Sequence, residues 1–141
     1  MSILRQTSGA ILIDVDGRFL LQQRDDKSEI LYPGMIGLFG GHREGGETFL
    51  QCVTREVREE TGLLLPPNRF VHFVSYNGAD PLGGTVHTET FIARDVPTDR
   101  LEVTEGSLLL VRPEDVGTVA AKLSPVARFA MNVFRERTAR S

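Results

Sequence analysis

Residues 41–63 read GHREGGETFLQCVTREVREETGL. Its central part, 48–61, contains neither glycine nor proline and has a glycine on each side, which predicts a helix with a glycine stop. Successive helical residues are about 100° apart, so Glu56, Glu59 and Glu60 lie together on one face.

Three carboxylates on one helix face repel one another and weaken the helix by a few tenths of a kcal/mol per pair. A cation that binds among them relieves this repulsion, and hard oxygen ligands suit Mg²⁺ or Mn²⁺. The alternative is a solvated, salt-bridged helix face, in which Arg55 pairs with Glu59 four residues later. An apolar stripe beside the acidic face can pack on a sheet; it comprises Leu50, Val53, Val57 and Leu64.

Glycines surround the start of the predicted helix. Gly40 and Gly41 precede it, and a second pair at 45–46 stands just before Glu47. Glycine lets the backbone turn tightly and approach a ligand closely. A glycine-rich loop that leads into a helix is also a place where phosphate oxygens meet backbone N–H groups. These glycines favour a phosphate-handling cation site over a merely solvated face.

The rest of the chain predicts strands and one more helix. Strands are expected at 10–13 and 19–24 around an Asp-Gly turn, and at 36–39, 69–76, 85–94 and 108–111. A last helix is expected from Pro125 to about Arg137, with Ser124 as its N-cap. Its apolar stripe suits core packing or a homodimer contact, and comprises Val126, Phe129, Ala130, Val133 and Phe134. The order predicts an α/β or α+β layered fold in one domain, 1–141.

Composition narrows the classes of function. The chain has 141 residues, 40% of them hydrophobic, and a formal net charge of -3. No basic footprint for nucleic acid is present, so nucleic acid is not the expected partner. One cysteine excludes an internal disulfide and fits a cytoplasmic setting. No apolar run approaches the roughly 20 residues of a membrane span, and no signal peptide is expected.

The segment 41–63 resembles the Nudix box, the signature of the Nudix hydrolase family. All its fixed positions are filled, namely Gly41, Glu47, Arg55, Glu56, Val57, Glu59, Glu60, Gly62 and Leu63. The resemblance implies an α/β/α sandwich with a mixed sheet between helices. Phe39 departs from the family pattern, in which proline is common before the glycine pair.

The resemblance also implies roles for individual residues. Glu56, Glu59 and Glu60 would bind Mg²⁺ or Mn²⁺, often joined by the carbonyl of Gly40, while Arg55 and Glu47 would orient these ligands. A further glutamate often completes such a site. Glu105 is similar in position to that residue, with Glu102 and Glu89 as competitors and a solvated loop charge as the alternative.

The implied activity is hydrolysis of a phosphoanhydride bond in a nucleoside diphosphate linked to another moiety. The substrate would be a nucleoside triphosphate, possibly oxidised, or a nucleotide sugar. Arg24, at the end of the second predicted strand, is similar to a phosphate-contacting arginine of related nucleotide hydrolases, although it also fits an exposed strand end. Either Glu60 or Glu105 would accept the proton of the attacking water.

Three other functions compete with hydrolysis. A non-catalytic nucleotide sensor is the main alternative, but such domains usually lack box glutamates and none is missing here. A decapping-type enzyme would act on RNA ends, which the acidic balance disfavours. An isoprenoid isomerase would need a catalytic cysteine in another context, and Cys52 in the predicted helix is better explained as a small packed residue.

Overall fold

The computed structural model describes residues 4–28, 30 and 32–140. Within these ranges seven strands form one mixed sheet with the order β3-β2-β1-β6-β5, while β4 pairs with β1 and β7 pairs with β2. The strands are β1 (Leu4–Asp14), β2 (Phe19–Gln23), β3 (Ile36–Gly37), β4 (Phe39–His42), β5 (Val71–Ala79), β6 (Thr85–Val96) and β7 (Ser107–Val111). The strands β1 and β6 run parallel, whereas the other pairs are antiparallel.

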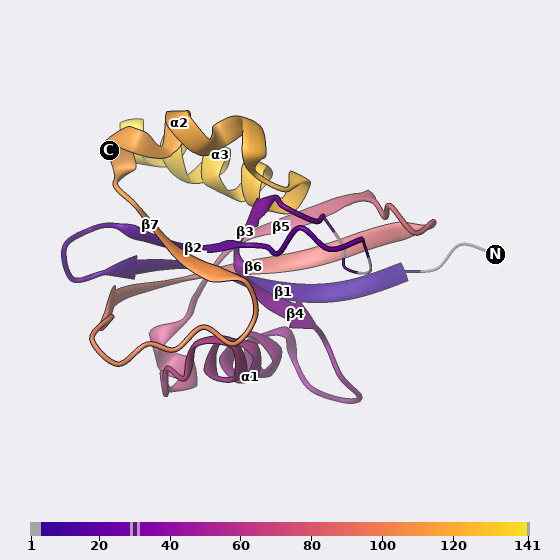
Figure 1. The fold of residues 1–141 in the computed structure, drawn as a ribbon. Coiled ribbons are helices and arrows are strands. Elements are labelled where there is room, and N and C mark those ends of the chain that lie inside the picture. The colour runs from indigo at the N-terminus through magenta and orange to yellow at the C-terminus, as the bar shows by residue number, and fades with distance from the viewer. Residues whose placement is uncertain (1–3, 29, 31, 141) are drawn as a thin grey trace.

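Helices cover both faces of this sheet. The helix α1 (Phe49–Thr61) lies on one face, and α2 (Val116–Val119) and α3 (Pro125–Ala139) lie on the other (Figure 1). Short 3-10 turns occupy Pro67–Arg69, Pro113–Asp115 and Ala120–Lys122. The expected α/β/α sandwich with a mixed sheet is therefore confirmed. In the described ranges, no helix is long and apolar enough to cross a membrane.

The side chains of β1 alternate between the two faces of the sheet and contribute to a hydrophobic core on each face. Ala10 and Leu12 pack with Val53 and Val57 of α1. Ile11 and Ile13 point the other way and belong to the core that includes Ala127, Ala130 and Met131 of α3. Because side chains of a strand alternate between its faces, one central strand can be buried on both sides, which explains the continuous apolar run at 10–13.

The hairpin predicted around Asp16-Gly17 forms between β1 and β2. Its turn is fixed by the buried carboxylate of Asp14, whose Oδ1 accepts the backbone N–H groups of Asp16 at 2.9 Å and Arg18 at 2.8 Å. The Arg18 side chain also donates to Asp14 Oδ2 at 2.8 Å. Both carboxylate oxygens of Asp14 therefore accept hydrogen bonds, as a buried charge requires.

The single strand predicted at 36–39 is wrong, because the structure divides this segment into β3 and β4. The strand β3 pairs with β2, whereas β4 pairs with β1 and places Phe39 opposite Ala10. The chain changes its partner strand at Leu38. Phe39 is fully buried in the core beneath α1.

Two predicted apolar stripes also need correction. Leu64 is 79% exposed, because the left-handed Gly62 redirects the chain and buries Leu63 and Leu65 instead. In α3, Phe129 is 37% exposed while other residues of the helix, Ala127 and Met131, are buried. Ser124 does occupy the N-cap position, but its side chain makes no capping hydrogen bond.

Candidate active site

The helix α1 has well-defined ends, which fixes the direction of its acidic face. Thr48 and Gln51 form a capping box, in which Thr48 Oγ1 accepts the Gln51 N–H at 3.0 Å and Gln51 Oε1 accepts the Thr48 N–H at 2.8 Å. At the other end Gly62 adopts a φ of 77° and donates its N–H to Arg58 O at 2.8 Å.

A hollow of about 430 Å³ opens at the edge of α1 and is here named the acidic hollow. It brings together residues that are far apart in the sequence: Glu56, Glu59 and Glu60 from α1, Gly40 and Gly41 from β4, Arg24 after β2, and Glu105 before β7. Tyr32, His42, Glu44 and Thr104 complete its lining. All the expected box carboxylates on α1 therefore face the same space as Glu105.

Glu60 is the most buried of these carboxylates, with 7% of the residue exposed. Gly40 donates its backbone N–H to Glu60 Oε1 at 2.8 Å, and Gln22 Nε2 lies 3.4 Å from Glu60 Oε2. Burial raises the pKa of Glu60 to about 8; the negative charges of Glu56 and Glu105 act in the same direction, and the bond from Gly40 opposes them. Glu60 is thus a carboxylate that a nearby positive charge would strongly favour in its ionised form.

Arg55 joins four parts of the site through one guanidinium group. It makes two hydrogen bonds to Glu47, at 2.7 Å and 3.1 Å, and its Nη1 reaches Glu56 Oε1 at 3.0 Å and Glu59 Oε2 at 3.1 Å. Its Nη2 also donates to the carbonyl oxygen of His42 at 3.0 Å. The predicted pair between Arg55 and Glu59 therefore exists, as one contact in a larger network.

This network sets the ionisation of its members. The hydrogen bonds from Arg55 lower the pKa of Glu47 to about 2 and raise that of the guanidinium in return. Burial raises the pKa of Glu56, although the Arg55 contact opposes this. Glu47 is consequently a fixed anion at neutral pH, and it holds Arg55 in place between the carboxylates.

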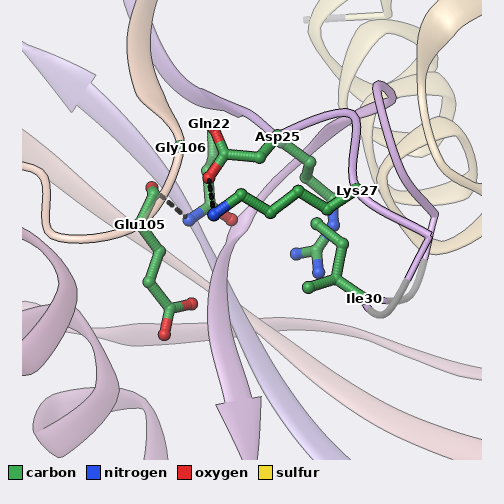
Figure 2. Close-up of a pocket in the computed structure, with 7 residues that line it drawn as sticks. Gln22, Asp25, Lys27, Ile30, Glu105 and Gly106 are labelled. Atoms are coloured by element: carbon green, nitrogen blue, oxygen red, sulfur yellow. Dashed lines mark hydrogen bonds and ion pairs between the residues drawn. The ribbon is translucent and has the colours of Figure 1, made fainter.

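Hydrogen bonds hold the loop that carries Glu105 against the C-terminal end of α1. Thr104 donates its N–H to Glu60 O at 3.0 Å and its hydroxyl to Glu59 O at 3.2 Å. Gln22 Nε2 donates to Glu105 O at 3.0 Å, a contact drawn in Figure 2. These bonds hold the Glu105 backbone next to the carboxylates of the helix.

The competitors of Glu105 lie elsewhere. Glu102 bonds through its N–H to Thr61 O and does not line the acidic hollow. Glu89 accepts hydrogen bonds from Ser75 Oγ and His72 Nε2, each at 2.6 Å, and faces His87 on the β5–β6 surface. Of the three glutamates considered from the sequence, Glu105 alone shares the space of the box carboxylates.

Gln22 belongs to this site although the sequence analysis did not single it out. Only 2% of the residue is exposed, and its amide reaches both Glu60 and the Glu105 carbonyl. The signal was present in the sequence, because a glutamine within the apolar strand FLLQQ must find hydrogen-bond partners when it is buried.

The glycine pair ahead of α1 is required by close contacts. A Cβ added to Gly41 would lie 2.5 Å from the carboxylate carbon of Glu56, and one added to Gly40 would lie 2.1 Å from Ser8 O. Gly40 therefore lets β4 approach β1, whereas Gly41 leaves room for the Glu56 carboxylate.

Cys52 is a packed residue rather than a nucleophile. It is fully buried, and its Sγ lies 3.5 Å from Gly41 O. Burial raises the pKa of its thiol, which disfavours the reactive thiolate.

The described residues hold no group of three His, Cys, Asp or Glu side chains already at the spacing of a metal site. The guanidinium of Arg55 instead bridges Glu56 and Glu59. The donor chemistry nevertheless fits a hard divalent cation, because one hollow is lined by five carboxylates, those of Glu44, Glu56, Glu59, Glu60 and Glu105. We regard the residues as suited to such an ion.

A sheet between helices, with glycine loops around an acidic helix, defines a recognisable class of α/β/α sandwich. Comparison with protein families matches residues 3–131 to the NUDIX domain. The chain belongs to the Nudix family.

Individual relatives agree with this membership. An ADP-ribose pyrophosphatase from Methanocaldococcus jannaschii is 33% identical over 75 residues, which cover 53% of this chain but only 43% of that protein. The match thus spans less than half the length of this curated relative.

Among solved structures, the MutT protein from Methanosarcina mazei Go1 has a TM-score of 0.82 and 22% identity, with 97% of this chain and 96% of that chain covered. The NUDIX domain of Shewanella oneidensis NrtR, complexed with ADP ribose, has a TM-score of 0.78 and 21% identity, with 98% and 90% covered. At this level of sequence identity, the two solved structures show that this chain shares their fold.

Proposed function

We propose that this chain is a divalent-metal-dependent pyrophosphohydrolase that cleaves a phosphoanhydride bond in a nucleoside diphosphate linked to another moiety. One observation carries the proposal: Glu56, Glu59, Glu60 and Glu105 line a single hollow together with the glycine pair and Arg24. Family membership and the matched ADP-ribose pyrophosphatase support the same class of reaction.

The four glutamates would hold Mg²⁺ or Mn²⁺ in the acidic hollow. A bound ion would neutralise the negative charge of phosphate oxygens and lower the pKa of a water molecule. Arg55 and Glu47 position Glu56 and Glu59 through the network described above, in the manner of outer-shell groups that orient ligands.

The residues of the chain also bind and orient the substrate. Arg24 offers a guanidinium to the phosphate oxygens, and Gly40 and Gly41 permit close approach of the backbone. In the reaction, the water oxygen bonds to one phosphorus, the bridging P–O bond breaks, and a carboxylate accepts the water proton. Glu60 and Glu105 are the two acceptors that we propose, because both carboxylates belong to the hollow.

Another hollow adjoins the acidic hollow and is here named the helix-side hollow; we propose that it holds part of the nucleoside half of the substrate. It lies between the sheet and the start of α3, has a volume of about 150 Å³, and shares Gly40, Gly41, Arg24 and Tyr32 with the acidic hollow. Its lining includes the hydroxyls of Thr7, Thr88 and Ser124 and the apolar side chains of Leu38 and Val126. Such a mixture of apolar surface and few polar groups is typical of small-molecule sites.

The test is hydrolysis by the purified chain with Mg²⁺ or Mn²⁺ and a panel of nucleoside triphosphates, oxidised triphosphates, ADP-ribose, nucleotide sugars and dinucleoside polyphosphates. Glu59→Gln is measured in parallel. Arg58→Lys, a substitution at an exposed position of the same helix, is the control for expression and purification of a variant protein. Cleavage of one class, lost in Glu59→Gln and kept in the control, is the expected result. Nucleotide binding seen as a raised melting temperature, without cleavage under any condition, would instead establish a nucleotide sensor.

A further inference from the structure

Three polar side chains connect the turn between β5 and β6 with the acidic hollow. Asp80 Oδ2 lies 2.6 Å from Arg5 Nε, and Arg5 Nη1 lies 3.1 Å from His42 Nε2. His42 lines the acidic hollow, whereas Arg5 and Asp80 stand outside its described lining. The function proposed above uses none of these three side chains.

The pairing of the strands brings Arg5 and His42 together. Thr7 of β1 stands opposite His42 of β4, and Arg5 precedes Thr7 by two residues. Residues two apart on a strand share one face of the sheet, and so do directly opposed residues of antiparallel strands. Arg5 and His42 therefore project from the same face, in agreement with the hydrogen bond between their side chains.

Asp80 fixes the position of the Arg5 guanidinium. Only 2% of the Asp80 side chain is exposed, and its Oδ1 accepts the Leu82 N–H at 2.9 Å, so the turn itself orients the carboxylate. Among the described residues Oδ2 has no hydrogen bond of good geometry, which leaves the ion pair with Arg5 to compensate its charge. A buried carboxylate is costly without a counter-ion, so the guanidinium is held beside it.

The contact with Arg5 determines which nitrogen of the His42 ring carries the hydrogen. A guanidinium has N–H donors and no acceptor, so His42 Nε2 must be the acceptor in the 3.1 Å contact. An imidazole whose Nε2 accepts a hydrogen bond carries its own hydrogen on Nδ1. The contact with Arg5 does not use this Nδ1–H group, which remains able to donate to another acceptor.

A donor on His42 suits the composition of the acidic hollow. Carboxylates dominate its lining, and Arg24 is the single arginine or lysine among its described residues. Thr104 already donates its hydroxyl to Glu59 O. Phosphate oxygens are acceptors and need donors around them, and a donor without charge does not compete with a metal ion for the carboxylates.

We propose that Arg5 and Asp80 are positioning residues that hold His42 in its Nδ1–H tautomer, and that this N–H donates a hydrogen bond to a phosphate oxygen of the ligand in the acidic hollow. The identity of the ligand rests on the proposed function, whereas the tautomer is a property of the unliganded protein. The two parts can therefore be tested apart.

Nitrogen NMR of the histidine rings in the full 141-residue chain tests the tautomer, with His42→Phe identifying the His42 signals among those of three histidines. The wild type is expected to show a protonated Nδ1 and an unprotonated Nε2. Arg5→Lys keeps a cation for Asp80 but replaces the fork with one nitrogen, so the His42 signals should move toward the mixed tautomers of an unconstrained ring. Arg94→Lys, at an exposed position of β6 outside the acidic hollow, is the matched control.

The melting temperature separates positioning from a purely structural role. It should stay close to the wild-type value in Arg5→Lys, because the ion pair with Asp80 is kept. A second variant that combines Arg5→Met with Asp80→Asn removes the ion pair together with its buried charge, and it should show the same change of His42 tautomer.

Inorganic pyrophosphate, added with Mg²⁺, is the probe for the donor. It is expected to shift the His42 Nδ1 signal and to bind on the order of tenfold more weakly to His42→Phe, the loss of one hydrogen bond to a charged group. His42→Asn should bind it almost as well as the wild type, since the asparagine amide offers an N–H near the position of Nδ1. His72→Phe changes a histidine of β5 outside the hollow and should leave the affinity unchanged.

The outcomes separate this role of His42 from the proposed function. A wild-type His42 with its hydrogen on Nε2, or one tautomer common to the wild type and both Arg5 variants, would overturn the positioning role. Equal pyrophosphate affinity in wild type and His42→Phe would overturn the donor. If no substrate is cleaved but the tautomer follows Arg5 and pyrophosphate affinity follows His42, the donor is established and the proposed function fails. If a substrate is cleaved with equal kcat/KM by wild type, Arg5→Lys and His42→Phe, the proposed function holds and the role of His42 is rejected.

Discussion

Arg55 makes two hydrogen bonds to the carboxylate of Glu47, one of 2.7 Å from Nη2 to Oε1 and one of 3.1 Å from Nε to Oε2. The remaining Nη1 is thereby directed at Glu56 and Glu59. A planar guanidinium can do this because its donors form a rigid fork, whereas an ammonium offers a single point of charge.

Arg55→Lys should therefore reduce kcat/KM by about 10- to 100-fold, the usual loss when a group that orients metal ligands is replaced. Lysine keeps the positive charge, so the loss of activity would come from the missing guanidinium contacts to Glu47, Glu56 and Glu59 and not from a change in charge. Steady-state kinetics and the melting temperature check this, with Arg58→Lys as control because Arg58 is exposed on the same helix. Full activity in Arg55→Lys would show that the fork is dispensable.

Glu105→Gln should weaken binding of Mn²⁺ about tenfold or more and lower activity, because it removes one of the four carboxylates that we propose as metal ligands in the acidic hollow. Glu102→Gln and Glu89→Gln should leave both quantities near the wild-type values, since neither residue lines that hollow. Calorimetric titration with Mn²⁺ separates the three variants. An effect from Glu102→Gln that matches that of Glu105→Gln would contradict the assignment.

Gly41→Ala should lower activity strongly while the melting temperature changes little. The added Cβ meets the flexible end of Glu56, 2.5 Å away, so the carboxylate moves and the backbone does not. Gly40→Ala should instead destabilise the fold, because its Cβ meets the backbone oxygen of Ser8. Gly46→Ala is the control, as nothing lies within 4 Å of its added Cβ. Equal loss of stability at positions 40 and 41 would refute this distinction.

Asp14→Asn should destabilise the protein by about 1.5–3 kcal/mol at neutral pH, the scale of hydrogen bonds to a charged group. Burial acts to raise the pKa of Asp14, but hydrogen bonds from Arg18 and Asp16 outweigh it and lower the pKa below its ordinary value of 3.8. A lowered pKa means stability that is present above 3.8 and lost as the pH falls through the folded-state value.

The difference between wild type and Asp14→Asn should accordingly shrink on acidification. Urea unfolding followed at neutral pH and at the lowest pH where the fold persists measures it. A difference that stays constant over this range would mean that the ionised carboxylate is not what stabilises the turn.

Local patterns predicted the helix and its chemistry well. The spacing of Glu56, Glu59 and Glu60, the stop at Gly62 and the hairpin at Asp16-Gly17 depend on neighbours within a few residues, and the structure contains all of them. Where tertiary contacts decide, the prediction failed. The change of partner at Leu38 splits one expected strand into two, because pairing with β1 or β2 depends on residues distant in sequence.

The same distinction holds for the site. The acidic face of α1 could be read from helical periodicity alone, but the choice among Glu89, Glu102 and Glu105 could not, because it depends on how the loop ahead of β7 returns to the helix. Gln22 was missed for a related reason. Its partners come from α1 and from the loop at Glu105, both distant in sequence.

The parallel pairing of β1 with β6 has a consequence for folding kinetics. It sets Leu4 opposite Thr85 and Ile11 opposite Ile92, so the loop that must close before the sheet is complete contains the whole of α1. Such long-range pairing raises contact order and slows folding. During synthesis α1 emerges before β6, the strand that contributes Phe91 and Ala93 to the core against which the helix packs. Until β6 is made, the apolar side of α1 has no complete sheet to pack on.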